Sequence, residues 1–539
     1  MSSEVTLQLN DALYNAGILG FMRIAEKQGI PYRWKGNRLQ FQLDDLQNFT
    51  ESYLNTVMDT YRDDTVYATI LKQYDNLICI PSKEEENLEK WWNDKDKKIG
   101  FRYIKEKMER VSYKKGFAII KERGETYDFL TNIKGIKEEK QYEKKAEKLA
   151  ILIDKLNQYE NVFLLKDIAY TKIQPFWTTM AFLNSKESET EFHTSFEKTF
   201  VDPAVHFQMD EKNGKFSCCQ CDVPLTKSNG CAMAWVNDVG IDIARKTSYF
   251  WEFNVDSFLC PVCNLIYACI PLGFTMKGSE GIFVNDNMSL RALKEINAVS
   301  AVVLSGEKED LFFRMMEQFS QITQATTMEQ EVENIQVVRR SNGRYVFNIL
   351  SKEKLQVLNF CKKDFAVLAR LSLKLQGVYV NIYRSTMQRI LNGENLYSLL
   401  YEILHTAIEA GTRTWFVRYL LKIQAVAFAK GERGMQEEKT VFAAMHCGAD
   451  LRARMLGDDK NENKVRGLSY KLLNALKVKD SHEFMDTVLR NYIGLGAKMP
   501  NGFVEVLKDE NSFLNFGYAF VTGLNGGLTQ KDETVGGVK

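Results

Sequence analysis

The sequence has almost no net charge. Its 71 Lys and Arg residues are balanced by 70 Asp and Glu residues, so the formal net charge is +1 with histidine neutral. A charge this small creates no long-range field that would draw the molecule toward nucleic acid or an anionic membrane. Any site for a polyanion therefore has to be local, and it has to be identified patch by patch.

Long apolar runs are also missing. The first ten residues, MSSEVTLQLN, contain neither the basic segment nor the apolar core of a secretory signal. The most apolar stretch, residues 258–274, is interrupted by two prolines and is shorter than the ~20 residues that a membrane span needs. We therefore expect a cytoplasmic protein without a membrane partner, whose ten cysteines are reduced thiols that can bind metal.

Catalytic motifs are absent as well. The sequence contains no Walker A loop, no HExxH, no GxSxG and no GxGxxG that follows a strand and opens a helix. Its five histidines are scattered, and three of them lie in helical patterns where a lone imidazole is usually structural. We therefore expect that the protein is not an enzyme.

The length of 539 residues exceeds the ~250–300 residues over which one hydrophobic core can grow, so several domains are expected. The patterns predict a predominantly helical α+β protein. We expect a mixed α/β N-terminal domain (1–200), an inserted zinc-ribbon-like module (201–290), a helical domain (291–430) and a C-terminal helical bundle (431–539). After residue 289 the periodicity predicts an all-helical C-terminal half.

The first predicted helix contains two glycines. Asn10 or Asp11 is its expected N-cap, and Gly29 is expected to end it. Gly17 and Gly20 lower the helix propensity of the segment. Their expected use is the close approach of a neighbouring backbone.

Two regions are candidates for contact with nucleic acid. Aromatic and basic residues interleave within residues 83–148, which is the composition of single-strand binding sites; the alternative is a charged helix and hairpin whose aromatic rings face the core. Residues 361–430 contain ten Lys and Arg against four acids, a local excess of six positive charges on what could also be a solvated surface. The candidate residues are Arg102, Lys105, Lys114, Lys115, Arg384, Arg389, Arg413, Arg418 and Lys422.

Four cysteines carry the strongest chemical signal. Cys218 and Cys221 are three residues apart, as are Cys260 and Cys263, which gives a CxxC…CxxC pattern. Two such pairs supply the tetrahedral thiolate set that Zn²⁺ prefers. A zinc ion with four thiolate ligands has no open position, so it would stabilise the fold and would not activate water.

The spacing of this pattern leaves two questions open. The loop between the pairs, residues 222–259, is longer than the common 15–20 residues, so an insertion such as a strand at residues 247–254 is expected. Cys219 and Cys231 lie close in sequence, and either could replace one of the named ligands. The alternatives to a zinc site are a pair of buried, redox-inert thiols and a thioredoxin-like CxxC.

Three parts of the sequence together resemble one family. The helix LYNAGILGF at residues 13–21, the central CxxC…CxxC and the long helical C-terminal half are similar to the Cst-type large subunit of the type I-B CRISPR surveillance complex, Cascade. The resemblance spans essentially the whole chain, and its specificity comes from the order of the parts, because the cysteine motif alone occurs in many zinc proteins. Only the four cysteines carry over residue by residue.

The resemblance implies a non-catalytic subunit of an RNA-guided complex. Such a subunit would recognise the flanking motif (PAM) in double-stranded target DNA, stabilise the R-loop and recruit the helicase-nuclease. The implied partners are CRISPR RNA, the Cascade backbone and guide-processing subunits, and a small subunit. The alternatives are a free-standing zinc-dependent nucleic-acid-binding regulator and a nucleic-acid-processing enzyme.

One segment suggests a second translation start. Residues 430–434, KGERG, must be encoded by purine-rich codons, and Met435 follows at a distance suited to a ribosome-binding site. Because type I-B systems often make their small subunit from inside the large-subunit gene, we expect a separate helical product that begins near Met435.

Overall fold

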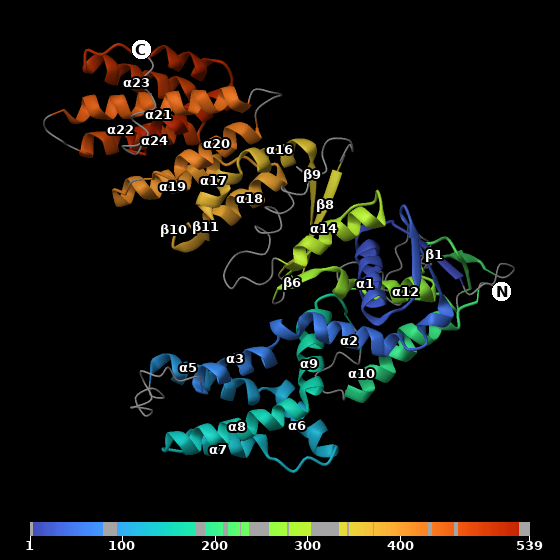
Figure 1. Cartoon of the computed structure of the whole chain (residues 1–539). Coiled ribbons are helices and arrows are strands. Elements are labelled where there is room, and N and C mark those ends of the chain that lie inside the picture. The colour runs from blue at the N-terminus through green and yellow to red at the C-terminus, as the bar shows by residue number, and fades with distance from the viewer. Residues whose placement is uncertain are drawn as a thin grey trace, which may run out of the picture. The chain divides into compact units, whose positions relative to one another are not determined.

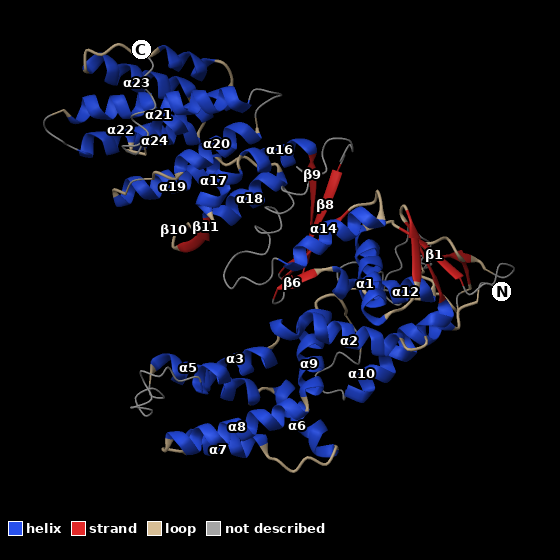
Figure 2. Ribbon diagram, in the orientation of Figure 1, coloured by secondary structure: helices blue, strands red, loops and turns tan. Residues whose placement is uncertain are grey.

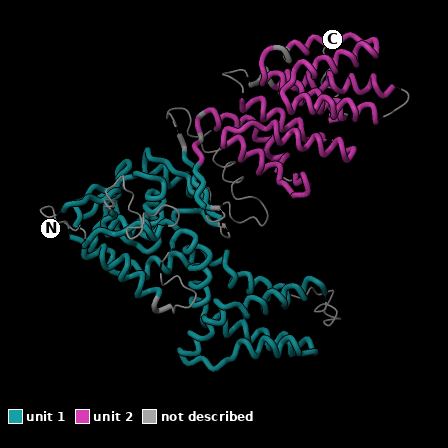
Figure 3. The backbone as a smooth tube through the Cα atoms, turned by 180° about the vertical axis from the view of Figure 1, so that it is seen from behind, with its two compact units in different colours: residues 1–318, 336–347 teal, residues 319–335, 348–539 magenta. Residues whose placement is uncertain are grey.

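The structure is a computed structural model. It describes residues 4–78, 94–178, 180, 189–208, 214–226, 228–236, 258–277, 280–302, 334–341, 344–369, 371–412, 414–428, 434–457 and 462–527. The chain forms two compact units, residues 1–318 with 336–347 and residues 319–335 with 348–539 (Figure 3). Helices dominate both units, and short strands accompany them (Figure 2), so the predicted α+β class with a helical majority is confirmed.

The first unit contains most of the strands (Figure 1). Its elements are β1 (Glu4–Gln8), α1 (Ala12–Gln28), β2 (Tyr32–Lys35), β3 (Arg38–Gln42), η1 (Leu43–Leu46), α2 (Phe49–Tyr61), η2 (Arg62–Asp64), α3 (Val66–Ile78), α5 (Lys95–Met108), α6 (Val111–Glu122), α7 (Phe129–Glu138), α8 (Tyr142–Gln158), α9 (Glu160–Ile168), η4 (Ala169–Ile173), α10 (Glu189–Phe196), η6 (Glu197–Val201), α11 (Asp202–Val205), β4 (Phe216–Ser217), β5 (Pro224–Leu225), α12 (Pro261–Ala268), α13 (Ile270–Gly273), β6 (Thr275–Lys277), β7 (Glu280–Asn285) and α14 (Leu290–Val302). Strands β8 (Asn334–Ser341) and β9 (Arg344–Ser351) complete an antiparallel sheet of order β6-β7-β8-β9.

Helix α1 is a buried helix of the first unit that packs against α2, α12 and α13. Its N-cap is Asp11, whose Oδ1 accepts hydrogen bonds from the backbone N–H of Leu13 at 2.9 Å and of Tyr14 at 3.0 Å. It ends at Gly29, which has a left-handed φ of 72°. All residues of the helix from Ala12 to Met22 are buried, as are Ile24 and Ala25. Strand β1 precedes the helix in the sequence and β2 and β3 follow it, and the three strands form one sheet in the order β1-β3-β2. The predicted cap and stop of this helix are confirmed.

Glycines let α1 approach α12 and α13 at backbone distance. A Cβ on Gly17 would lie 2.3 Å from the carbonyl oxygen of Ile266, and a Cβ on Gly20 would lie 2.0 Å from that of Cys269. From the other side, a Cβ on Gly273 would lie 1.9 Å from the carbonyl oxygen of Ala16. The prediction that the two glycines of α1 serve close backbone approach is confirmed.

The second unit is a stack of helices with one hairpin. Its elements are α16 (Lys352–Phe360), α17 (Lys362–Leu368), β10 (Ser372–Leu375), β11 (Val378–Asn381), α18 (Ile382–Asn392), α19 (Tyr397–Ala410), α20 (Val417–Ala427), α21 (Gly434–Leu456), α22 (Glu462–Lys477), α23 (Ser481–Gly494), η10 (Asn501–Leu507) and α24 (Glu510–Leu524). Helices α21 and α24 pack closely, because a Cβ on Gly523 would lie 1.9 Å from the carbonyl oxygen of Met445.

The prediction of an all-helical C-terminal half is wrong in one respect. Strands β8 to β11 lie within it. Gln376 and Gly377 both have positive φ, 47° and 87°, which is the geometry of a tight two-residue hairpin turn between β10 and β11. Gly377 therefore lies in a turn between two strands.

Two further expectations concern the chain as a whole. None of the helices in the described ranges is long and apolar enough to cross a membrane. The four-part division at residues 200, 290 and 430 stays a prediction, because a compact unit of this kind can contain more than one folding domain.

Candidate metal centre

The first cysteine pair lies on the turn of a short hairpin. Strands β4 and β5 pair antiparallel, and the turn between them contains Cys218 and Cys221. The backbone closes on itself, because Asp222 N–H donates to the carbonyl of Cys218 at 2.9 Å and Cys218 N–H donates to that of Val223 at 2.9 Å. Asp222 has a φ of 60°, a left-handed conformation that Asp tolerates better than most residues. This tight turn carries both thiols.

The second pair lies at the start of a helix. Cys260 is the N-cap of α12, and its sulfur accepts a hydrogen bond from the backbone N–H of Cys263 at 3.3 Å. Pro261 follows at the first helical position, where its missing N–H costs nothing. The N-terminal end of a helix favours negative charge, so it favours both cysteines as thiolates.

Backbone pairing joins the two pairs. Cys219 N–H donates to the carbonyl of Phe258 at 3.0 Å. Cys231 and Leu259 exchange two hydrogen bonds, at 2.8 and 2.9 Å. The hairpin is therefore held against the start of α12, although residues 226–260 separate the two in sequence. Of these, residues 237–257, which include the expected strand at 247–254, lie outside the described part of the chain.

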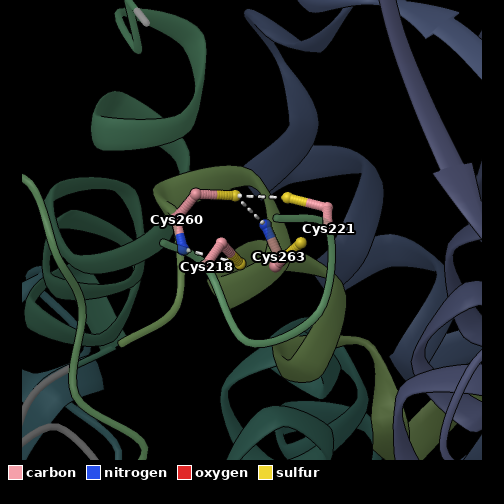
Figure 4. Close-up of side chains that lie close together, drawn as sticks. All are labelled: Cys218, Cys221, Cys260 and Cys263. Carbon is pink, nitrogen blue, oxygen red and sulfur yellow. Dashed lines mark hydrogen bonds between the residues drawn. The ribbon is translucent and has the colours of Figure 1, made fainter. Parts of the chain in front are cut away.

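The four predicted cysteines form one cluster (Figure 4). Their sulfur atoms all lie within 4.8 Å of one another, and Cys221 Sγ is 3.6 Å from Cys260 Sγ. Zinc–sulfur bonds of ~2.3 Å in a tetrahedron place the sulfurs about 3.8 Å apart. The donor set therefore fits a zinc ion with only small side-chain movements. Four thiolates around one ion leave no position for water or substrate.

The polar surroundings support the negative charge of the cluster. Cys260 N–H donates to Cys218 Sγ at 3.2 Å. As free thiols the four groups share protons: hydrogen bonding with Cys221 lowers the pKa of Cys218 well below its usual range. Hydrogen bonding with Cys218 raises the pKa of Cys263. A cation that replaces these protons removes the competition among the sulfurs.

Residues of helix α1 also contact the cluster, and the sequence interpretation missed them. Tyr14 Oη lies 3.1 Å from Cys263 Sγ, and burial raises the pKa of this hydroxyl well above its usual range, so it keeps its proton. Gln220, inside the first CxxC, donates from Nε2 to Asp11 Oδ2 at 2.7 Å, and Tyr267 donates to the same oxygen at 2.8 Å. The N-cap of α1 is thus tied to both cysteine segments.

The alternative ligands do not join the cluster. Within the described residues the group that could hold a metal ion consists of the four cysteines named from the sequence. Cys219 is exposed and its sulfur lies 3.8 Å from Met233 Sδ. Burial raises the pKa of Cys231 to about 11, and its sulfur is not part of the cluster.

The basic candidates of the first unit lie on two helices. Arg102 and Lys105 belong to α5, and both have acidic partners one turn away, Glu106 at 3.9 Å and Glu109 at 3.6 Å. Lys114 and Lys115 are exposed on α6. Lys105 is half-buried, whereas Arg102 and the two lysines of α6 are exposed.

The aromatic residues between these basic residues face the core. Tyr113 is buried and stacks on Phe163 with ring centroids 5.1 Å apart, and Phe117 stacks on Phe129 at 4.6 Å. These rings are not available for stacking on bases, which favours the core alternative for this segment. Residues 91 and 92, both tryptophan, lie outside the described residues.

The basic candidates of the second unit differ in their surroundings. Arg384 and Arg389 lie on α18, where Arg389 donates to Ser398 Oγ at 2.9 Å. Arg418 and Lys422 lie on α20, and Arg413 lies outside the described residues. Lys422 Nζ is held between two carboxylates, those of Asp364 at 3.2 Å and Glu438 at 3.1 Å. The charge of Lys422 is therefore compensated within the second unit, which makes this residue a weak candidate for a phosphate contact.

One comparison with known proteins gives a match. Residues 211–275 match the model of a family described as CRISPR-associated protein (Cas_CXXC_CXXC). This segment contains all four clustered cysteines, the hairpin β4–β5 and helix α12. No curated protein and no solved structure matches the chain. The match supports a CRISPR-associated role for this protein.

Proposed function

We propose that the protein is a non-catalytic subunit of an RNA-guided CRISPR surveillance complex, and that its cysteine cluster binds Zn²⁺ as a structural ion. The observation that carries the proposal is the coincidence of the four-thiol cluster with the segment that matches a CRISPR-associated family. Four sulfur ligands complete the coordination of zinc, so the ion would stabilise the fold and would not activate water.

The energetic role of the ion follows from the small size of its surroundings. Strands β4 and β5 have two residues each, and an isolated hairpin of this length is not stable in water. The hairpin has further contacts with the rest of the unit. Its backbone pairs with that of Phe258, Gln220 donates to Asp11, Leu225 is buried, and the ring of Phe216 lies 5.1 Å from that of Phe258. Zinc would add to these contacts the free energy of its four sulfur bonds, which would join the turn of the hairpin to the start of α12.

The finer assignment is the type I-B large subunit. In this role the protein would recognise the PAM in double-stranded target DNA, stabilise the R-loop and recruit the helicase-nuclease, while the CRISPR RNA reads the sequence by base pairing. The near-zero net charge suits a subunit whose nucleic-acid site is completed by RNA and by neighbouring proteins. Its partners would be the Cascade backbone and guide-processing subunits and a small subunit.

Lys114 and Lys115 are the best candidates for phosphate contacts in the first unit, because both are exposed on α6. Reversal of both charges, Lys114→Glu with Lys115→Glu, should weaken the binding of target duplex by the assembled complex. The slope of the logarithm of the binding constant against the logarithm of the salt concentration should become less steep by about two. Lys134→Glu with Lys137→Glu on α7 is the matched control, because it changes the charge equally at two exposed positions. Equal loss in both variants would contradict a specific contact.

The small subunit is proposed to come from the same gene. A product that begins at Met435 would contain nearly all of α21 together with α22, α23, η10 and α24. In a C-terminally tagged chain, a non-start codon at Met435 should abolish the short product, whereas the same change at Met455, one residue before the end of the same helix, should not. A short product that persists in the first variant would refute this start site.

Co-purification tests the main proposal. Tagged full-length chain, expressed with its neighbouring genes, should carry along a CRISPR RNA and repeated backbone subunits, and it should contain one zinc ion per chain. An RNA-free protein that binds DNA alone would favour the regulator, and turnover of a nucleic-acid substrate by the isolated chain would favour the enzyme. Either result would overturn the proposal.

A further inference from the structure

Helix α1 reaches the cysteine cluster through one side chain, Tyr14. This residue lies 249 positions before Cys263 in the sequence, and its ring is 5.5 Å from that of Tyr267 on α12. Its hydroxyl is 3.1 Å from Cys263 Sγ, which is hydrogen-bonding distance for sulfur. The contact is buried, so water does not compete for either atom.

We propose that Tyr14 is a positioning residue for the metal: its hydroxyl donates a hydrogen bond to the Cys263 thiolate and thereby couples metal binding to the docking of α1. The proposal rests on the metal centre proposed above. In the metal-loaded cluster all four sulfurs are thiolates without hydrogen atoms. The proton of this contact therefore belongs to Tyr14, which becomes the donor.

A donor is needed at this place because of charge. One Zn²⁺ and four thiolates carry a net charge of two negative units in a largely buried site, and such a charge is stable only when hydrogen bonds compensate it. Backbone N–H groups supply one donor to Cys218 and one to Cys260. Tyr14 supplies a donor to Cys263 from outside the cysteine segments.

The same helix is tied to the other cysteine pair. Asp11, three residues before Tyr14, accepts hydrogen bonds from Gln220 and Tyr267 through Oδ2 while its Oδ1 caps α1. The first turn of α1 therefore contacts the hairpin of the first pair and the helix of the second pair. Loss of the ion would loosen both attachments together, so metal release should expose the start of α1.

The test uses the full chain and the variant Tyr14→Phe, which removes only the hydroxyl. Chelator competition should show zinc affinity weaker by about 10- to 100-fold, the usual effect of removing a group that orients a metal ligand. In the cobalt(II)-loaded protein, the sulfur-to-metal charge-transfer band should shift to longer wavelength, because the thiolate loses a hydrogen bond. Hydrogen exchange of α1 should become faster after metal removal from the wild-type protein.

Tyr53→Phe is the matched control. Tyr53 is fully buried in α2 of the same unit, and its hydroxyl makes no hydrogen bond among the described residues. The control should leave both the affinity and the band unchanged. If Tyr14→Phe does not fold, 3-fluorotyrosine at position 14 keeps the hydroxyl and makes it a stronger donor, and the band should then move to shorter wavelength.

The outcomes separate the two proposals. Wild-type protein that holds no zinc overturns the proposed metal centre itself. Wild-type protein that holds zinc while Tyr14→Phe keeps the same affinity and the same band overturns only the role of Tyr14. An equal shift in Tyr53→Phe also overturns that role, because the band would then report a general change of the core.

Discussion

The close contact between α1 and α13 predicts a large effect from a single methyl group. The perturbation is Gly20→Ala. Its Cβ would lie 2.0 Å from the carbonyl oxygen of Cys269 and 3.1 Å from the backbone nitrogen of Gly273, whereas ordinary van der Waals contact begins at 3.4 Å. Because both obstacles are backbone atoms of a buried helix, they cannot rotate away, and the two helices have to separate by more than ~1 Å.

The expected cost lies at the upper end of the range for overpacked cores, about 3 kcal/mol. It opposes the gain of about 0.5–1 kcal/mol that Gly→Ala normally gives in a helix. Gly135→Ala in α7 isolates that gain, because no atom lies within 4 Å of its Cβ position. The two substitutions are chemically identical, so their difference measures the contact alone.

Urea unfolding followed by tryptophan fluorescence is a suitable assay, since Trp177 and Trp235 are buried in the first unit. With a denaturant slope of ~3 kcal/mol per M, Gly20→Ala should lower the midpoint by about 1 M, whereas Gly135→Ala should raise it slightly. An unchanged or higher midpoint for Gly20→Ala would refute the reasoning, because the helices would then have room that the structure does not give them.

Three further predictions concern metal, pH and an ion pair. Cys260→Ser should abolish tight zinc binding and lower the melting temperature of the metal-loaded protein, and a variant that still holds one zinc per chain would contradict the four-thiolate site. Burial raises the pKa of the Asp167 carboxyl from 3.8 to about 6, so the folded state binds this proton more tightly than the unfolded state does. The proton's contribution to the free energy of unfolding is therefore complete below pH 4, and it falls by about 3 kcal/mol as the pH rises to 6. Asp167→Asn should therefore gain stability over the wild-type protein across this interval and keep a constant advantage above it, and parallel pH profiles of the unfolding midpoint would show the assignment to be wrong. Lys422→Met should destabilise the second unit by about 1–3 kcal/mol, because it leaves the carboxylates of Asp364 and Glu438 without their shared cation, and an unaltered melting curve would contradict this.

The sequence predicted those features whose cause is local. The spacing of two CxxC pairs sufficed to predict that the four cysteines cluster, since each pair needs only one turn of chain to bring two sulfurs together. Asp11 and Gly29 marked the ends of α1 through their own capping preferences. Pro261 after Cys260 is also a local signal, because proline favours the first position of a helix and so indicates that a helix starts at the second cysteine pair.

Features that depend on distant contacts could not be predicted in this way. The contact of Tyr14 with Cys263 and that of Gln220 with Asp11 join residues more than 200 positions apart, and nothing in either segment specifies the other. The aromatic residues near Tyr113 had the composition of a base-stacking surface, and only the tertiary packing on Phe163 decides that the ring is part of the core.

The cysteine cluster and the glycine contacts belong to one physical arrangement. Helix α12 begins at the cysteine cluster, and α13 directly follows it, so the same backbone that carries two of the cysteines also presents its carbonyls to Gly17 and Gly20. Apolar burial attaches this segment to α1 at one end, whereas the hairpin at the other end has too few residues for a core of its own. The proposed ion would therefore add its stability at the hairpin end. Metal removal should consequently release the hairpin and the first turn of α1 before it affects the glycine contacts. Cys260→Ser should therefore destabilise the first unit at the start of α12, whereas Gly20→Ala should destabilise it at α13.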